Sequence, residues 1–139
     1  NPISSTRLCT NKNRIRFSSV VASPDKINFG INIRSDVATD DTVVGIFRRS
    51  INRVDILTNY YTGNEFISFS PSGMNFAYKG DCFEGLCALF IKSSETLASK
   101  ASLRNPLVDD PAQNITFVRW ISDNEIEYKL GSELKRFSF

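Results

Sequence analysis

The residues best suited to chemistry in this sequence are three cysteines, Cys9, Cys82 and Cys87. Cys82 and Cys87 are five positions apart and flank Phe83-Glu84-Gly85-Leu86, a gap that suits a disulfide across the mouth of a hairpin. Two free thiols are an alternative. A metal site is a third reading, but structural zinc needs four ligands and the sequence has no histidine. A disulfide would indicate an oxidising compartment such as the periplasm, and Cys9 would then have no cysteine partner within this sequence.

The absence of histidine also limits catalysis, because it removes the Ser-His-Asp and Cys-His arrangements. The two neighbouring acids Asp81 and Glu84 make a thiolate at Cys82 or Cys87 harder to form, which disfavours a cysteine nucleophile. Three pairs of carboxylates remain, but their spacing matches no catalytic or calcium-binding motif: Asp40 with Asp41, Asp109 with Asp110, and Glu125 with Glu127. We therefore expect no catalytic residue, no metal and no cofactor.

An aromatic residue, Phe83, stands at the tip of the cysteine-flanked loop between two acids. A rigid, exposed aromatic side chain is typical of protein interfaces, and the other reading is a ring folded back on its own sheet. The candidate partner-binding residues are Gly80, Asp81, Phe83, Glu84 and Gly85. Because the loop would be held by the two cysteines, we expect it to present these residues in one conformation.

Composition excludes two further classes of partner. The formal net charge is +2, and no basic stripe interleaved with aromatic residues predicts binding to nucleic acid. No apolar stretch approaches the roughly 20 residues that cross a membrane as a helix. The sequence starts at Asn1 rather than methionine, which we interpret as removal of a leader, and its 139 residues suit a single domain over 1–139.

The elements that would position these residues belong to a pattern that occurs three times. Each copy is a short apolar run, a turn rich in Pro, Asp, Ser, Gly or Asn, and a second alternating run. The turns lie near Pro24, Pro71 and Ser122, so the spacings are 47 and 51 residues. A period of this length is typical of stacked or radial β units. Trp120, just before the third turn, is predicted to lie in the core with its indole N–H on a carbonyl, or else to be an exposed anchor.

Alternation and turn residues predict mostly strands of five to seven residues. Met74, Phe76 and Tyr78 should share one face, and Ile126 and Tyr128 should point inward. The segment 94–103 fits a short helix or a strand equally well. The predicted strands are 14–21, 27–34, 43–49, 53–58, 66–70, 74–79, 86–92, about 96–102, 115–120, 125–129 and 133–138. The expected fold is all-β and antiparallel, a small irregular β-propeller-like body of about three sheets.

The run Phe69-Ser70-Pro71-Ser72-Gly73, with Ala77-Tyr78 and then Cys87-Ala88-Leu89-Phe90-Ile91-Lys92, resembles the blades of TolB-like and WD-type β-propellers. In those repeats a turn of the Ser-Pro-Asp-Gly kind joins two strands. The third copy lacks the proline and has Ser122-Asp123-Asn124-Glu125 instead. The resemblance spans about residues 14–139 and implies antiparallel sheets arranged side by side.

Residues 67–131 also resemble the immunity proteins that neutralise peptidoglycan amidase effectors of type VI secretion. A turn, a strand, a protruding loop, a strand and a Trp-containing unit ending in Leu130-Gly131 occur in the same order. Members of that family are compact, propeller-like, all-β and cleaved after a leader, and one loop plugs the active-site groove of the enzyme. Carried onto this chain, the resemblance assigns that role to 79–86, which here is bracketed by cysteines.

These observations lead us to expect a non-enzymatic periplasmic inhibitor that neutralises a cognate amidase effector by loop insertion. The alternative is a fragment or self-associating subunit of a β-propeller scaffold, because three units fall short of the four blades of the smallest closed propellers. A hydrolase that uses the acidic pairs is the third reading. We expect a monomer or a weak homo-oligomer.

Overall fold

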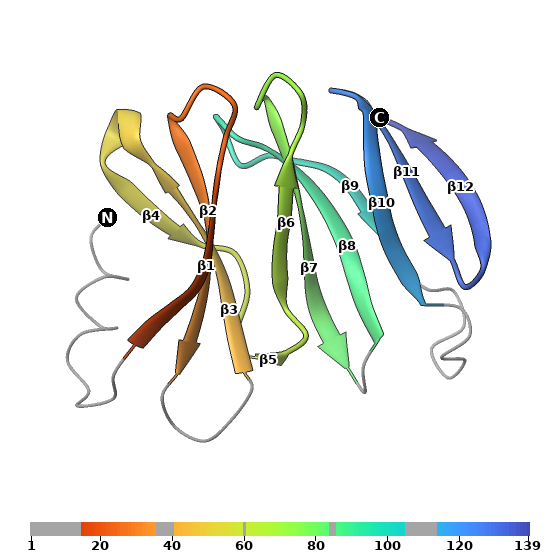
Figure 1. Ribbon diagram of the computed structural model, residues 1–139, viewed down its shortest axis with the longest axis horizontal. Helices are drawn as coiled ribbons and strands as arrows, with labels where there is room; N and C mark the ends of the chain where they lie inside the picture. Colours follow the sequence, from red (N-terminus) through yellow and green to blue (C-terminus); the bar gives the residue numbers. More distant parts are fainter. Residues whose placement is uncertain (1–14, 36–40, 60, 84–85, 105–113) are drawn as a thin grey trace.

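A computed structural model of the chain describes residues 15–35, 41–59, 61–83, 86–104 and 114–139. These residues form antiparallel strands, with one turn of 3-10 helix, η1 (Arg49–Ile51), between β3 and β4 (Figure 1). The strands are β1 (Ile15–Ala22), β2 (Asn28–Ser35), β3 (Asp41–Arg48), β4 (Arg53–Ile56), β5 (Tyr61–Thr62), β6 (Glu65–Phe69), β7 (Asn75–Phe83), β8 (Leu86–Ser93), β9 (Ser99–Leu103), β10 (Ile115–Ser122), β11 (Glu125–Leu130) and β12 (Glu133–Ser138).

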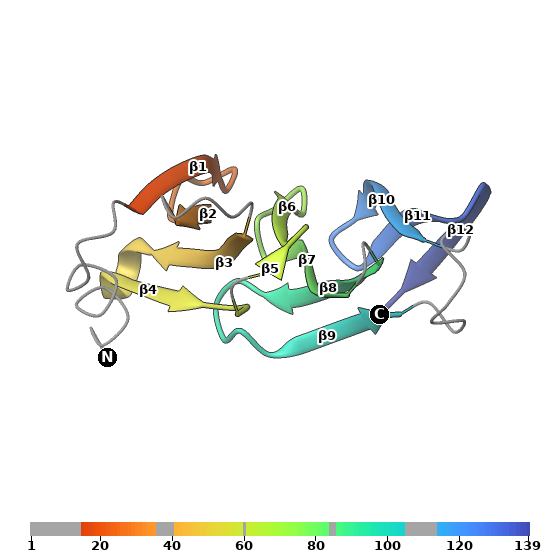
Figure 2. The same ribbon diagram turned by 90° about the horizontal axis from the view of Figure 1, so that it is seen from below.

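The strands form three sheets that lie side by side (Figure 1). Sheet 1 has the order β1-β2-β3-β4, with β5 added to the end of β3; sheet 2 is β6-β7-β8-β9 and sheet 3 is β10-β11-β12. Seen from below, the first strands β1, β6 and β10 lie along one side of the molecule, and β4 and β9 lie along the other (Figure 2). The predicted all-β, antiparallel fold of about three sheets is therefore confirmed.

The repeated turns close the first hairpin of sheets 1 and 2 in the same way. Ser23 and Ser70 are buried, and the hydroxyl of each accepts a hydrogen bond from the backbone N–H five residues later, at 3.0 and 3.1 Å. Three residues after each serine the backbone is left-handed, with φ of 58° at Lys26 and 80° at Gly73. A serine hydroxyl that bonds the backbone and a left-handed residue three positions later therefore occur in both hairpins.

Sheets 1 and 2 pack face to face through an aromatic core. Phe66, Phe69, Phe76 and Tyr78 of sheet 2 lie against Val44 and Ile46 of sheet 1, and all six are buried. Gly30 of β2 makes room for this layer, because a Cβ at that position would lie 2.2 Å from the ring of Phe66. The two sheets thus approach closely at a residue with no side chain.

The other face of sheet 2 packs on sheet 3. Ala77, Leu89, Ile91 and Ala101 meet Ile115 and Ile126 in a second buried cluster. Trp120 lies half-buried at this junction, and its Nε1 donates to Oγ of Ser68 at 3.0 Å. The predicted core position of Trp120 is therefore correct, but its indole N–H bonds a serine hydroxyl rather than a carbonyl.

Alternation predicted most faces correctly. Phe76 and Tyr78 face sheet 1, and Ile126 and Tyr128 face sheet 2. Met74 is an exception, because it precedes β7, lies in the turn and is exposed. The helical alternative for 94–103 is wrong: the residues after a turn form β9, and Leu97 has a left-handed φ of 61°, which a right-handed helix does not allow.

Candidate functional site

The candidate site lies at the end of the β7–β8 hairpin. The ladder pairs Gly80 with Ala88, shifts register, and resumes with Phe83 opposite Leu86. Asp81 lies in the bulge with a left-handed φ of 48°, a conformation that aspartate tolerates better than most residues. The prediction that this strand ends at residue 79 is therefore wrong, because a bulge lets the pairing with β8 continue to Phe83.

A disulfide joins the two strands at this end. The Sγ atoms of Cys82 and Cys87 are 2.07 Å apart, and their Cα atoms are 4.0 Å apart. Cys82 is buried, and Cys87 is half-buried. Of the three readings of the cysteines, the bridged pair is therefore the one that the geometry supports, and it closes the hairpin as the spacing predicted.

The disulfide rests on the segment before β6. Gly63 has a φ of 96°, and a Cβ there would lie 3.3 Å from Sγ of Cys87 and 3.4 Å from Sγ of Cys82. Only glycine meets both demands without strain, since its backbone is left-handed and the sulfur atoms lie directly against it. The end of the hairpin is consequently closed by the disulfide and packed against Gly63.

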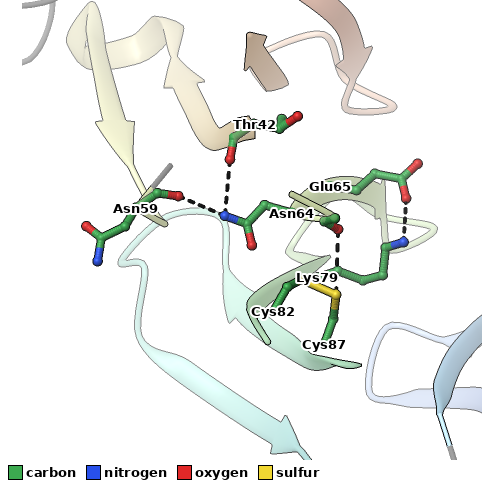
Figure 3. The surroundings of a disulfide bond; sticks show 8 residues. Thr42, Asn59, Asn64, Glu65, Lys79, Cys82 and Cys87 are labelled. Atoms are coloured by element: carbon green, nitrogen blue, oxygen red, sulfur yellow. Dashed lines mark hydrogen bonds and ion pairs between the residues drawn. A yellow bond between two sulfur atoms is a disulfide. The ribbon is translucent and has the colours of Figure 1, made fainter. Parts of the chain in front are cut away.

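Asn64 connects this support to sheet 1. Its amide Nδ2 donates to the carbonyls of Thr42 and Asn59, at 3.1 and 2.8 Å (Figure 3). Beside it, Nζ of Lys79 on β7 lies 2.9 Å from a carboxylate oxygen of Glu65 on β6. Figure 3 shows these contacts grouped around the disulfide, so side chains of both Asn64 and Lys79 hold the base of the hairpin in place.

The exposed acid of the hairpin has a partner. An oxygen of Asp81 lies 2.6 Å from Nη2 of Arg104, which follows β9, and the Arg104 guanidinium lies 5.5 Å from the centroid of the Phe90 ring. Both charged side chains are more than half exposed, so the pair contributes at most about 1 kcal/mol to stability. Burial, with a smaller effect of Asp81, raises the pKa of Tyr78 to about 12.

The predicted partner-binding residues do not share one environment. Gly80 is buried, and a Cβ there would lie 3.1 Å from Cγ2 of Thr58 and 3.3 Å from the Phe90 ring. Asp81 is exposed. Phe83 is the last residue of β7, its side chain lies outside the described part of the structure, and so do Glu84 and Gly85. Gly80 is therefore packed between Thr58 and Phe90, whereas Asp81 is exposed beside Arg104.

A groove of about 620 Å³ runs beside the hairpin, between sheets 2 and 3. Its walls include Tyr61, Lys79 and Cys87 together with the start of β10. No sequence motif pointed to Tyr61 or Arg104. Tyr61 comes near the hairpin through β5 at the edge of sheet 1, and Arg104 through the pairing of β9 with β8 within sheet 2. The groove extends the candidate surface from the hairpin onto sheet 3.

The acidic pairs show no catalytic arrangement where the structure describes them. Oδ1 of Asp41 accepts from the Thr62 hydroxyl at 2.9 Å. Glu127 is buried between two arginines, and hydrogen bonds from Arg119 and Arg136 hold the pKa of its carboxyl below the usual value. The other two pairs include Asp40, Asp109 and Asp110, which lie outside the described residues.

Neither a metal-binding cluster nor a membrane-spanning helix is present among the described residues. Within the five described ranges, no three His, Cys, Asp or Glu residues are placed so that they would hold a metal ion. No helix in the same ranges is long and apolar enough to span a bilayer. The comparisons with known proteins gave no match, neither to a family model nor to a curated protein.

Proposed function

We propose that this protein is a non-enzymatic inhibitor that binds a cognate cell-wall amidase effector of type VI secretion through the β7–β8 hairpin. The observation that carries the proposal is the closed hairpin end, with the Cys82–Cys87 disulfide resting on Gly63. Binding costs less free energy when the inserted segment is already ordered, because its side chains lose less freedom on association. A bridged hairpin on a packed sheet provides that order.

The residue types at the hairpin end suit a polar groove with an apolar centre. In the proposal Phe83 enters the enzyme's active-site groove as the apolar anchor, and Glu84 meets polar or basic groups around it. Asp81 already pairs with Arg104 at 2.6 Å, so this end of sheet 2 presents an acidic and a basic group side by side. The buried Gly80 takes a supporting part rather than a contacting one.

The same feature supports an exported protein. Disulfides persist in oxidising compartments and are rare in reducing ones, so the bridge favours the periplasm, where a cell-wall amidase acts. The resemblance over 67–131 favours the same partner and the same mode of inhibition.

The decisive test is inhibition of a peptidoglycan amidase effector encoded beside this gene, measured on purified cell walls. We expect stoichiometric inhibition by the wild-type protein and at least a tenfold weaker inhibition constant for Phe83→Ala. Met74→Ala is the control, because Met74 is 58% exposed and lies in the turn before β7, at the opposite end of that strand from Phe83. Equal inhibition by Phe83→Ala and the wild type would refute the insertion mechanism.

A deletion of 81–86, although simpler, is a poor test, because Cys82 is buried and β7 pairs with β8 up to Phe83. Such a deletion would remove structure as well as contacts. Absence of inhibition by the folded wild-type protein would overturn the proposed function itself.

A further inference from the structure

The turns at one end of the molecule enclose a cleft of about 630 Å³. Its lining comes from the β1–β2, β3–β4, β6–β7, β8–β9 and β10–β11 turns and the strand ends beside them, so all three sheets contribute. These turns lie at the top of Figure 1, whereas the β7–β8 hairpin lies at the bottom. The cleft is therefore separate from the candidate site at the hairpin, and its volume is typical of ligand-binding pockets.

Hydrogen bonds between neighbouring turns hold the cleft in one shape. Three of them each join two hairpins: from Oγ of Ser72 to Oδ1 of Asp123 at 2.7 Å, from the backbone N–H of Ser94 to the carbonyl of Met74 at 2.9 Å, and from Nη1 of Arg48 to the carbonyl of Glu95 at 2.7 Å. Gly73 also lies against the β1–β2 turn, since a Cβ there would be 3.2 Å from Cδ of Pro24. A surface that is already ordered in this way loses little conformational freedom on binding.

Three large aliphatic side chains are exposed in this cleft. Ile27, Ile51 and Met74 line it and are 44%, 54% and 58% exposed. They come from three different turns, two of sheet 1 and one of sheet 2. Single exposed apolar residues are common on protein surfaces, but several that line one concave site indicate contact with an apolar ligand.

Polar groups without partners lie beside these aliphatic side chains. Lys100 is the extra residue of a bulge, between Ser99 and Ala101, and a bulge redirects a side chain. Among the described residues, neither the ammonium of Lys100 nor the carboxylate of Glu95 has an ion-pair partner. Ser94 in the lining is buried, and within the same ranges its hydroxyl has no hydrogen-bond partner. The cleft therefore offers both donors and acceptors to a ligand.

We propose that this cleft binds an extended peptide segment of a protein partner, one with apolar side chains and no net charge. The aliphatic groups receive its side chains, and the unpartnered polar groups pair with its backbone carbonyl and N–H groups. The lining favours a neutral segment, because its charged residues are two acids and two bases: Asp25, Glu95, Arg48 and Lys100. This inference does not depend on the β7–β8 hairpin or on inhibition of an amidase.

Selection from a phage library of random heptapeptides on the immobilised protein, followed by fluorescence anisotropy of the selected peptides, tests the cleft. We expect peptides with apolar residues at alternating positions, because successive side chains of an extended chain point to opposite sides. Their dissociation constants should be about 10–100 μM. Met74→Ser and Ile51→Ser should each weaken binding at least fivefold, since each removes apolar contact.

Leu134→Ser is the matched control, because Leu134 is 54% exposed but lies on β12, outside the lining of the cleft. Circular dichroism checks that each variant is folded, and Ile27→Ser replaces any cleft variant that is not. Phe83→Ala should leave peptide binding unchanged, since Phe83 is at the other end of β7.

Three results would each overturn the proposal. The first is a selection that enriches no peptide over the bare support. The second is a set of selected peptides that bind the Met74→Ser and Ile51→Ser variants as tightly as the wild type. The third is loss of peptide binding in Phe83→Ala, which would place the peptide at the hairpin instead of the cleft.

Discussion

Adding one methyl group at Gly30 should lower the free energy of unfolding by about 3 kcal/mol. An alanine Cβ would lie 2.2 Å from Cδ1 and Cε1 of Phe66, whereas ordinary contact begins at 3.4 Å, so the ring would have to move by about 1.2 Å. The ring has little room to do so, because it stacks on Phe76 at 5.5 Å between centroids and its backbone N–H bonds Oδ1 of Asn32 at 2.7 Å. The expected loss of stability is therefore at the upper end of the range for substitutions that overpack a core.

Urea unfolding followed by the fluorescence of the single tryptophan, Trp120, measures this change. The midpoint should fall while the slope stays constant. Gly45→Ala is the matched control, since Gly45 also lies within a strand of sheet 1 and its Cβ would have no neighbour nearer than 3.3 Å. We expect that control to change stability by less than about 1 kcal/mol in either direction.

A double-mutant cycle identifies the ring as the obstacle. Phe66→Leu removes ring atoms and should cost about 1–2 kcal/mol alone through lost packing. Combined with Gly30→Ala it should cost at least about 1 kcal/mol less than the sum of the two single changes, because the new methyl group then has room. Additive costs, or a Gly30→Ala variant within about 0.5 kcal/mol of the wild type, would refute the close approach of sheets 1 and 2.

Three further outcomes follow from the structure. Reduction of the Cys82–Cys87 bond, or replacement of both cysteines by serine, should lower the free energy of unfolding by about 2 kcal/mol, since the closed loop is short; dithiothreitol should leave the serine variant unchanged. Burial raises the pKa of Tyr78 to about 12, so the stability provided by its neutral ring is complete below pH 10 and is lost as the pH rises towards 12. One tyrosine should accordingly titrate late in absorbance at 295 nm and Tyr78→Phe should remove that step, whereas titration of all tyrosines near pH 10 would contradict the burial. Hydrogen bonds, first from Arg119, hold the pKa of the Glu127 carboxyl below 4.5. In urea unfolding, the wild type should therefore exceed Glu127→Gln in stability most above pH 4.5, and the difference should shrink as the pH falls. A difference that does not depend on pH would contradict the ion pairs.

Most of the fold that could be predicted from the sequence follows from patterns among residues close together in the chain. Ser23 and Ser70 mark turns because a serine hydroxyl bonds the backbone of the same hairpin. Ile126 faces inward because strand residues alternate between faces. The Cys82–Cys87 bridge could be anticipated as one alternative, because the four residues between the cysteines suffice for a tight hairpin. Where two local patterns competed, as at 94–103, the sequence left the element open and the left-handed Leu97 decided it.

The candidate site was predictable only in part. The cysteine-closed segment could be found from spacing, but the bulge at Asp81 and the continuation of β7 to Phe83 depend on how the ladder resumes after a register shift. The pairing of Asp81 with Arg104 joins residues 23 positions apart, and no local signal precedes it. Gly80 was predicted to contact a partner but is buried, because it packs against Phe90 on the neighbouring strand.

The sequence by itself determined an all-β chain of antiparallel hairpins, with two cysteines spaced so that a disulfide was one of three possibilities, since each depends on residues close together in the chain. Only the tertiary structure decided what each sheet face meets. Gly30 matters because Phe66 from another sheet lies against it, and Trp120 is half-buried because its indole N–H bonds Ser68 of the neighbouring sheet. Alternation tells which side chains share a face, whereas the neighbour of that face is chosen by packing between sheets far apart in sequence.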